Sequence, residues 1–216
     1  FFRASLSSPF NQTDSLLFLR IPKNASSSIM EKLGTRNIVK KYEKKLQESL
    51  DNNIYKDFFS ATHARPHELQ SVISPVEFGC FSFAVVRNPW DRVVSMYHFS
   101  IKKGLANLFG LDNDLSFEGF CEVLRSREGD RSFMPVFKQT EWTHGSIEVD
   151  EILKFENLSE DFSAMIKNHD IKDMPPHLPH HNSTIHKPYR DYFNSGTQKI
   201  IKKVFEEDCD LLKYVF

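Results

Sequence analysis

The sequence has 216 residues, 40% of them hydrophobic and 26% charged, which is usual for one globular domain that buries a core. Its 28 basic and 29 acidic residues give a net charge of −1, which argues against a protein whose whole surface holds a polyanion such as nucleic acid. The three cysteines are widely spaced without a CxxC pair, so they indicate neither a disulfide framework nor a zinc knuckle.

Apolar runs and amphipathic stretches alternate along the chain. The expected elements, in chain order, are a strand at 16–21, helices at 26–33 and 38–50, a strand at 58–61, a helix from about 66, a strand at 81–86, helices at 89–101 and 115–127, a strand at 152–155, and helices at 158–168 and 197–207. This alternation predicts an α/β fold with a mostly parallel central sheet flanked by helices. Ligands of such sheets bind beyond the carboxyl ends of the strands.

The turn after the first strand reads "IPKNASSSI" (21–29) and combines a lysine with three serines at the start of a helix. Unpaired N–H groups and the helix dipole favour an anion there, and Lys23 adds a full charge. The simpler interpretation is a serine that caps the helix beside a solvated lysine. The loop is not a Walker A motif, because G-x-x-x-x-G-K-[ST] is absent.

A second strand-to-helix turn reads "VVRNPWDRVVSMYHF" (85–99). Arg87 could make a forked contact with a phosphate, and Ser95 follows two turns into the helix. Pro89 and Asp91 also suit an ordinary helix start. Two such loops on neighbouring strands predict a ligand with two separated anionic groups. No acidic cluster suggests magnesium between them, which disfavours a kinase or an ATPase.

Seven motifs in this order resemble one known family. They are "IPKNASSSI", "THARPHEL" (62–69), "VVRNPWDRVVSMYHF", "QTEW" (139–142), "ILKFENLSEDF" (152–162), "LPHHNSTIHKPYRDYF" (178–193) and the closing "DCDLLKYVF". The sequence resembles the sulfotransferases that use 3′-phosphoadenosine 5′-phosphosulfate (PAPS). Within them it is similar to the carbohydrate branch, which includes heparan sulfate 2-O- and chondroitin-type enzymes and bacterial relatives. The resemblance implies a single P-loop-like three-layer domain over residues 1–216, with an extension at 1–14.

The resemblance also implies how PAPS, and its desulfated product PAP, would be bound without a metal. The 5′-phosphosulfate would lie on Pro22, Lys23, Asn24, Ala25, Ser26, Ser27 and Ser28, and the 3′-phosphate on Arg87 and Ser95. Segment 175–193 would cover the donor, with Ser183, Thr184, His186, Lys187 and Arg190 as phosphate or adenine contacts. Four histidines at 177–186 have a spacing that allows zinc, but prolines and missing cysteine or carboxylate partners favour the covering role.

Sulfuryl transfer needs in-line placement, positive charge on the leaving oxygen and a base for the acceptor hydroxyl. Lys23 is the expected source of that charge. His63 is the expected base near neutrality, because it follows the predicted strand 58–61 at the level of both loops. A histidine that merely packs at a strand end is the alternative. His67 is a weaker competitor, and Glu156 is expected to give structural support.

The acceptor is expected to be a hydroxyl of a glycan or of a small metabolite. Trp90, Tyr97, Phe99 and Trp142 could stack on a sugar or pack in the core, and Lys102, Lys103, Arg125 and Arg127 could attract an acidic glycan or be solvated. The rival functions are a magnesium- and ATP-dependent phosphotransferase and a non-catalytic anion-binding module. A glycan on the sequon at Asn24 would obstruct the first loop, which favours the cytoplasm. The Golgi lumen, after loss of an N-terminal anchor, is the alternative.

Overall fold

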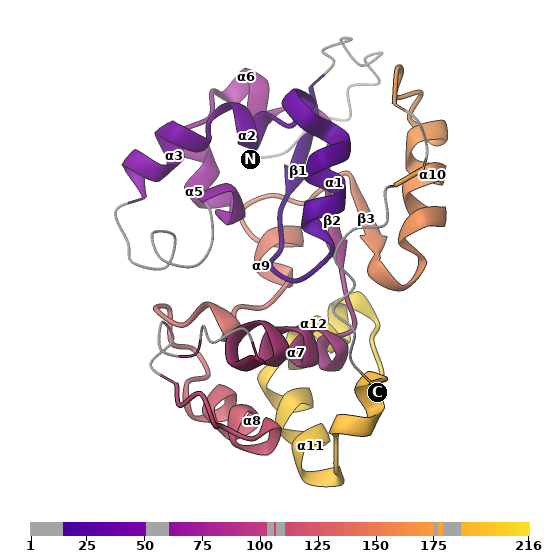
Figure 1. The fold of residues 1–216 in the computed structure, drawn as a ribbon. Helices are drawn as coiled ribbons and strands as arrows, with labels where there is room; N and C mark the ends of the chain where they lie inside the picture. The colour runs from indigo at the N-terminus through magenta and orange to yellow at the C-terminus, as the bar shows by residue number, and fades with distance from the viewer. Residues whose placement is uncertain (1–14, 51–60, 103–105, 107–110, 175–176, 179–186) are drawn as a thin grey trace.

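The computed structural model describes residues 15–50, 61–102, 106, 111–174, 177–178 and 187–216. Its sheet consists of β1 (Leu17–Leu19), β2 (Ser82–Val86) and β3 (Glu151–Lys154). Their spatial order is β1-β2-β3, and both pairings are parallel. With helices on either side of the sheet (Figure 1), the expected α/β fold is confirmed.

Most of the remaining described chain is helical. The α-helices are α1 (Ser26–Leu33), α2 (Ile38–Lys41), α3 (Glu43–Ser49), α5 (Pro66–Gln70), α6 (Pro75–Phe78), α7 (Pro89–Tyr97), α8 (Phe117–Ser126), α9 (Thr140–Thr143), α10 (Leu158–Asn168), α11 (Ser195–Val204) and α12 (Glu206–Leu212). Short 3-10 turns include Ala61–His63 and Tyr189–Tyr192, and a π-helical turn follows α7 at His98–Lys102. In Figure 1, α7, α8, α11 and α12 lie together at the end of the molecule toward which β2 leads.

Alternation along the strands divides the core between the two faces of the sheet, because successive side chains of a strand point to opposite faces. Leu17, Leu19, Ala84 and Val86 belong to the larger cluster, which includes residues of α7, α8, α11 and α12. Phe18, Phe83, Val85 and Leu153 belong to the smaller cluster, with residues of α1 and α10. β1 and β2 are therefore buried on both faces, which explains their continuous apolar sequences.

Several expected elements differ from the observed ones. The 38–50 helix is interrupted at Tyr42, whose hydroxyl bonds to Glu77 of α6. The last helix is broken at Phe205, whose ring is 1% exposed, so the chain turns there and α12 continues to Leu212. The expected strand 58–61 is wrong at Ala61, because a hydrogen bond from Ala64 N to Ala61 O (3.0 Å) closes a 3-10 turn. Its other residues lie outside the described ranges.

Candidate functional site

The loop between β1 and α1 has an unusual backbone. Lys23 and Ala25 both adopt positive φ angles, 71° and 54°, which are costly for residues other than glycine. Ala25 is the N-cap of α1 and has no side-chain acceptor, so the expected serine cap is not formed. The N-cap residue therefore satisfies none of the first-turn N–H groups of α1, which an anion could accept from.

The amide of Asn24 holds this loop in place. Its Nδ2 donates to Val85 O of β2 and to Gln139 Oε1, each at 2.7 Å, and the residue is only 1% exposed. Its Oδ1 is buried and accepts no hydrogen bond from the part of the chain that the structure describes. Two directed bonds in a buried setting can offset the strain of two left-handed residues. Because the amide is enclosed, the sequon at Asn24 is closed to a glycan in the folded chain.

Arg87 opens the second loop and joins it to the first. Its Nη1 donates to Lys23 O (3.1 Å) and its Nε to Asp91 Oδ2 (2.8 Å). The guanidinium stacks on Phe155, 4.1 Å from the ring centroid. In the described part of the chain no acceptor binds Nη2. Ser95, 4% exposed, lies further along α7. The structure thus brings Arg87 next to the Lys23 loop, as the sequence predicts.

Lys23 and His63 lie close enough to influence each other. The Lys23 ammonium is 4.1 Å from the centroid of the Phe99 ring. His63 Nδ1 is 2.8 Å from Arg20 O, which makes Nδ1 the protonated donor and leaves the lone pair on Nε2. Burial lowers the pKa of His63 well below its usual range, and the charges of Arg20 and Lys23 lower it further. His63 is therefore neutral at pH 7, with a pKa lower than the expected near-neutral value.

The other expected site residues lie in the Tyr189–Tyr192 turn, in the segment before it, and on α5. Arg190 lies in the Tyr189–Tyr192 turn, where its guanidinium is 4.9 Å from the Phe216 ring, and Lys187 is exposed. Helix α7 contacts this turn, and burial raises the pKa of Tyr189, with a smaller contribution in the same direction from Asp91 of the second loop. Ser183, Thr184, His186 and two further histidines of the 177–186 cluster lie outside the described residues. His67 is exposed on α5.

A buried polar network that the sequence does not reveal supports both loops. Asp208 of α12 accepts from Gln139 N and Thr140 N, each at 3.0 Å. Arg92 donates to Pro22 O (3.3 Å) and Phe137 O (3.0 Å), and its burial lowers its pKa to about 10. Three of these residues, Gln139, Thr140 and Asp208, lie in the motifs "QTEW" and "DCDLLKYVF". The motifs could have drawn attention to these residues, but nothing in the two sequences indicates that they hold the loops.

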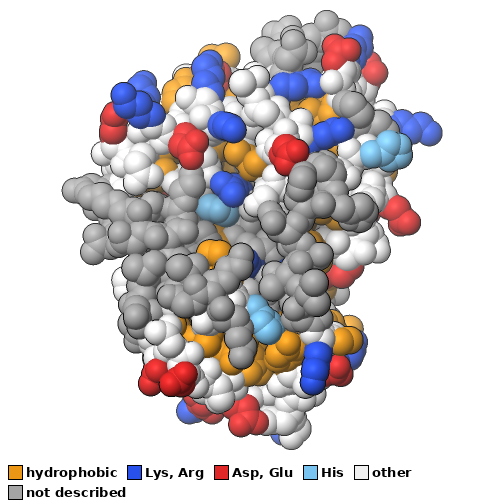
Figure 2. All heavy atoms as spheres, viewed as in Figure 1, with side chains coloured by type: hydrophobic (Ala, Val, Ile, Leu, Met, Phe, Trp, Pro, Cys, Tyr) orange, Lys and Arg blue, Asp and Glu red, His pale blue; other side chains and the backbone are white. Residues whose placement is uncertain are grey.

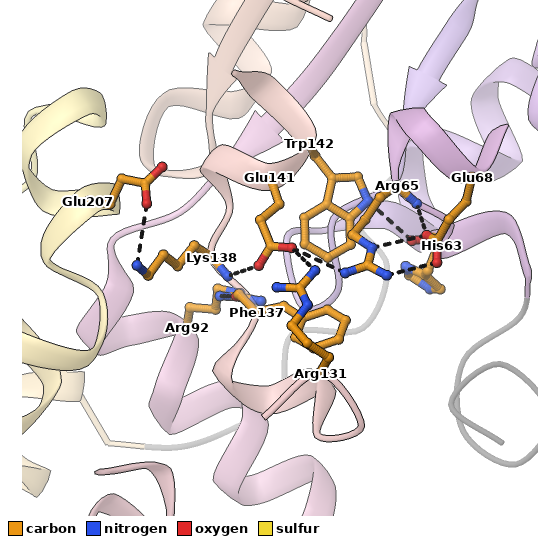
Figure 3. A network of polar contacts seen from close by, with 10 residues as sticks. All are labelled: His63, Arg65, Glu68, Arg92, Arg131, Phe137, Lys138, Glu141, Trp142 and Glu207. Carbon is orange, nitrogen blue, oxygen red and sulfur yellow. Dashed lines mark hydrogen bonds and ion pairs between the residues drawn. The ribbon is translucent and has the colours of Figure 1, made fainter. Parts of the chain in front are cut away.

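Figure 3 shows the polar contacts beside His63. Glu141 accepts from Arg131 Nη2 (2.6 Å) and Arg65 Nη1 (3.3 Å), while Arg65 also pairs with Glu68 at 2.8 Å. Trp142 Nε1 donates to His63 O at 3.1 Å. The backbone of His63 is therefore held by Trp142 of α9, and Arg65, two residues on, pairs with Glu68 of α5.

Residues that could contact a glycan are mostly engaged elsewhere. Trp90, Tyr97 and Trp142 are buried at 3%, 7% and 0% exposure, so for these three the interpretation as core residues is confirmed. Arg125 pairs with Glu122, and Arg127 with Asp130. Acidic and basic side chains are interspersed on the described part of the face in Figure 2. The sugar-stacking interpretation retains only half-buried Phe99.

Comparison with known proteins identifies the chain. A family model described as "Sulfotransferase family" matches residues 9–215. The chain belongs to the sulfotransferase family. It is accordingly a transferase that moves a sulfuryl group. A comparison with curated proteins finds no match.

The described residues of this sulfotransferase contain no group of three or more His, Cys, Asp or Glu side chains arranged to hold a metal ion. Within the same ranges, no helix is both long and apolar enough to cross a bilayer.

Proposed function

We propose that the protein transfers the sulfuryl group of PAPS to a hydroxyl of a carbohydrate. One observation carries the proposal: the two loops that could each hold an anion follow adjacent parallel strands, and Arg87 Nη1 donates to Lys23 O between them. PAPS has two separated anionic groups on one nucleotide, which matches this pair of loops. A small hydroxylated metabolite is the alternative acceptor, and the cytoplasm is the proposed compartment.

The first loop would hold the 5′-phosphosulfate. Residues 22–28 offer the first-turn N–H groups of α1, serine hydroxyls and the Lys23 ammonium. Arg87 and Ser95 would hold the 3′-phosphate, with Lys187 and Arg190 from the covering segment. The strained backbone of Lys23 and Ala25 supports this assignment, because such strain is concentrated at binding sites.

In the reaction, the acceptor oxygen forms a bond to sulfur while the bond from sulfur to the phosphate oxygen breaks. The electron pair of that bond stays on the phosphate of PAP, where Lys23 would stabilise the growing negative charge. The acceptor proton would pass to His63 Nε2. The contact of Nδ1 with Arg20 O supports this choice, because it orients the ring and leaves the lone pair on Nε2.

The donor can be tested by thermal unfolding. PAP without metal should stabilise the protein by about 2.7 kcal/mol at 100 times its dissociation constant, which is several degrees of melting temperature for a chain of this size. Stabilisation by ATP with magnesium but not by PAP would instead support a phosphotransferase. Incubation with radiolabelled PAPS and a panel of glycans and metabolites would then identify the acceptor. Binding of PAPS without transfer to any acceptor would favour a non-catalytic module.

A further inference from the structure

The side chain of Gln139 lies between the two loops and bonds to both. Its Oε1 accepts from Asn24 Nδ2 (2.7 Å) and from Arg87 N (2.9 Å). Its Nε2 donates to Arg87 O at 2.8 Å. Gln139 is 0% exposed. One buried amide thus contacts a side chain of the first loop and both backbone polar groups of the residue that opens the second.

The backbone that carries this side chain is held by Asp208 of α12. Asp208 Oδ2 accepts from Gln139 N, and Asp208 Oδ1 from the next backbone N–H, at Thr140. The residue therefore cannot shift without breaking bonds to α12. A shorter or non-polar side chain at position 139 would leave Arg87 N and Arg87 O buried without this partner, which is costly.

We propose that Gln139 is a positioning residue that sets the distance between the 5′ and 3′ anion sites. The proposal rests on the assignment of PAPS to these loops. A nucleotide with both anionic groups binds tightly only when both loops are at the right separation at the same time. A nucleotide with one such group needs one loop only. Gln139 would thus select donors that carry a 3′-phosphate, without touching the donor itself.

The test compares three ligands on one variant, Gln139→Met, which keeps the side-chain length and removes the hydrogen bonds. We expect calorimetry to show PAP affinity falling by about 10- to 100-fold, because three buried hydrogen bonds to the two loops are lost. Affinities for 5′-AMP and 3′-AMP, each of which engages one loop, should change by less than about 3-fold. Equal losses for all three ligands, or an unchanged affinity for PAP, would overturn the proposal.

A matched control and a second variant separate positioning from general damage. Leu124→Ala removes a fully buried side chain of α8 and should lower stability while leaving the ratio of PAP to mononucleotide affinity unchanged. In Gln139→Glu, a protonated carboxyl can reproduce the donor and acceptors of the amide, whereas the ionised form faces Arg87 O. Burial raises the pKa of such a carboxyl. The loss of PAP affinity relative to wild type should therefore shrink from about pH 8 to about pH 6.

If the difference in PAP affinity between wild type and Gln139→Glu does not change with pH, the inference is contradicted, even if Gln139→Met fails to fold. The wild-type protein, measured in parallel, accounts for titration of the nucleotide phosphates and of His63. Wild-type protein that binds no PAP would refute the proposed function and this inference together. Wild-type binding of PAP that survives Gln139→Met unchanged would refute only the inference.

Discussion

His63 and Lys23 affect each other through their charges. Lys23 helps to keep His63 neutral, because a second cation nearby is unfavourable in a buried setting. A neutral imidazole can accept a proton, and after it does so the imidazolium would lie near Lys23 and Arg20. That charge is easiest to accommodate while the leaving phosphate of the product is still bound. In the proposed mechanism, the pair would therefore link proton uptake to sulfuryl transfer.

Replacing His63 should separate catalysis from binding. His63→Ala is expected to keep PAP affinity nearly intact and to lower turnover by about 10²–10⁴-fold, the usual contribution of a positioned base. Lys23→Ala should lower turnover similarly and also weaken donor binding, because the ammonium would face the phosphosulfate of PAPS before the reaction. Both are measured with radiolabelled PAPS and the acceptor found in the screen. Near-normal turnover in His63→Ala would exclude it as the base.

Arg87 is expected to report on the 3′-phosphate. Arg87→Ala should cost about 2–4 kcal/mol of PAP affinity, because it removes a charged, forked donor. Adenosine 5′-phosphosulfate lacks that phosphate and should lose much less. Titration of the wild type and of Arg87→Ala with both ligands gives the comparison. Arg190, whose guanidinium lies against Phe216, is replaced in a second arginine variant, Arg190→Ala. Equal losses for both ligands in Arg87→Ala would place Arg87 away from the 3′-phosphate.

The left-handed backbone of the first loop is maintained by the contacts of the Asn24 side chain with other elements, and the loop contains no glycine. Lys23 and Ala25 take left-handed conformations that glycine would adopt without strain. Asn24, between them, is bonded to β2 and to the residue that precedes α9. The loop is therefore a strained element clamped at its middle residue.

Removing that clamp should loosen the loop. Asn24→Ala is expected to lower the free energy of unfolding by about 1–3 kcal/mol, because Val85 O loses its side-chain donor in a buried setting. PAP affinity should fall as well, since the first-turn N–H groups would no longer be held for the anion. Denaturant unfolding and calorimetry measure the two effects. Ser27→Ala, at an exposed position of the same loop, is the control for stability. Unchanged stability in Asn24→Ala would contradict the clamp.

The elements that the sequence predicted well are those in which local pattern and packing agree. The apolar run before Pro22 and the one before Arg87 both form strands, because both are buried on two faces. The predictions failed where tertiary contacts decide, as at the break at Phe205 and the turn at Ala61. Both loops of the site follow from strand order and family motifs. Gln139 could not be predicted, because its partners lie 52 and 115 positions away.

The C-terminal end of the chain meets the second loop. Glu156 accepts from Asn88 N (2.7 Å) and from Tyr214 Oη (2.9 Å), and Asn88 Nδ2 donates to Val215 O (2.9 Å). This bears out the expected supporting role of Glu156. The last residues of the chain thus help to fix the backbone next to Arg87.

Stability of the whole molecule should depend on pH through His63. Its pKa is lowered in the folded state, so the unfolded chain takes up a proton first as pH falls below about 6.5. Folding stability contributed by the neutral side chain is therefore present above that pH and lost below it. His63→Gln should lose less stability than wild type between about pH 7.5 and pH 5.5. Denaturant unfolding at both pH values checks this.

His67→Gln, the same substitution at an exposed position, is the matched control. Burial raises the pKa of Glu141 and of Asp208, which acts in the opposite direction and equally in both variants. Identical slopes for His63→Gln and His67→Gln would show that His63 does not titrate as proposed.

The long sequence separation of the contacts at Gln139 has a consequence for folding kinetics. Contacts between residues 52 to 115 positions apart require the closure of large loops, which slows their formation. Asp208 adds another closure of 69 positions to the same residue. The two anion loops should therefore reach their final separation late, after local helices have formed. In a refolding experiment, recovery of nucleotide binding should lag behind recovery of helical circular dichroism, so the nucleotide would report the completion of folding.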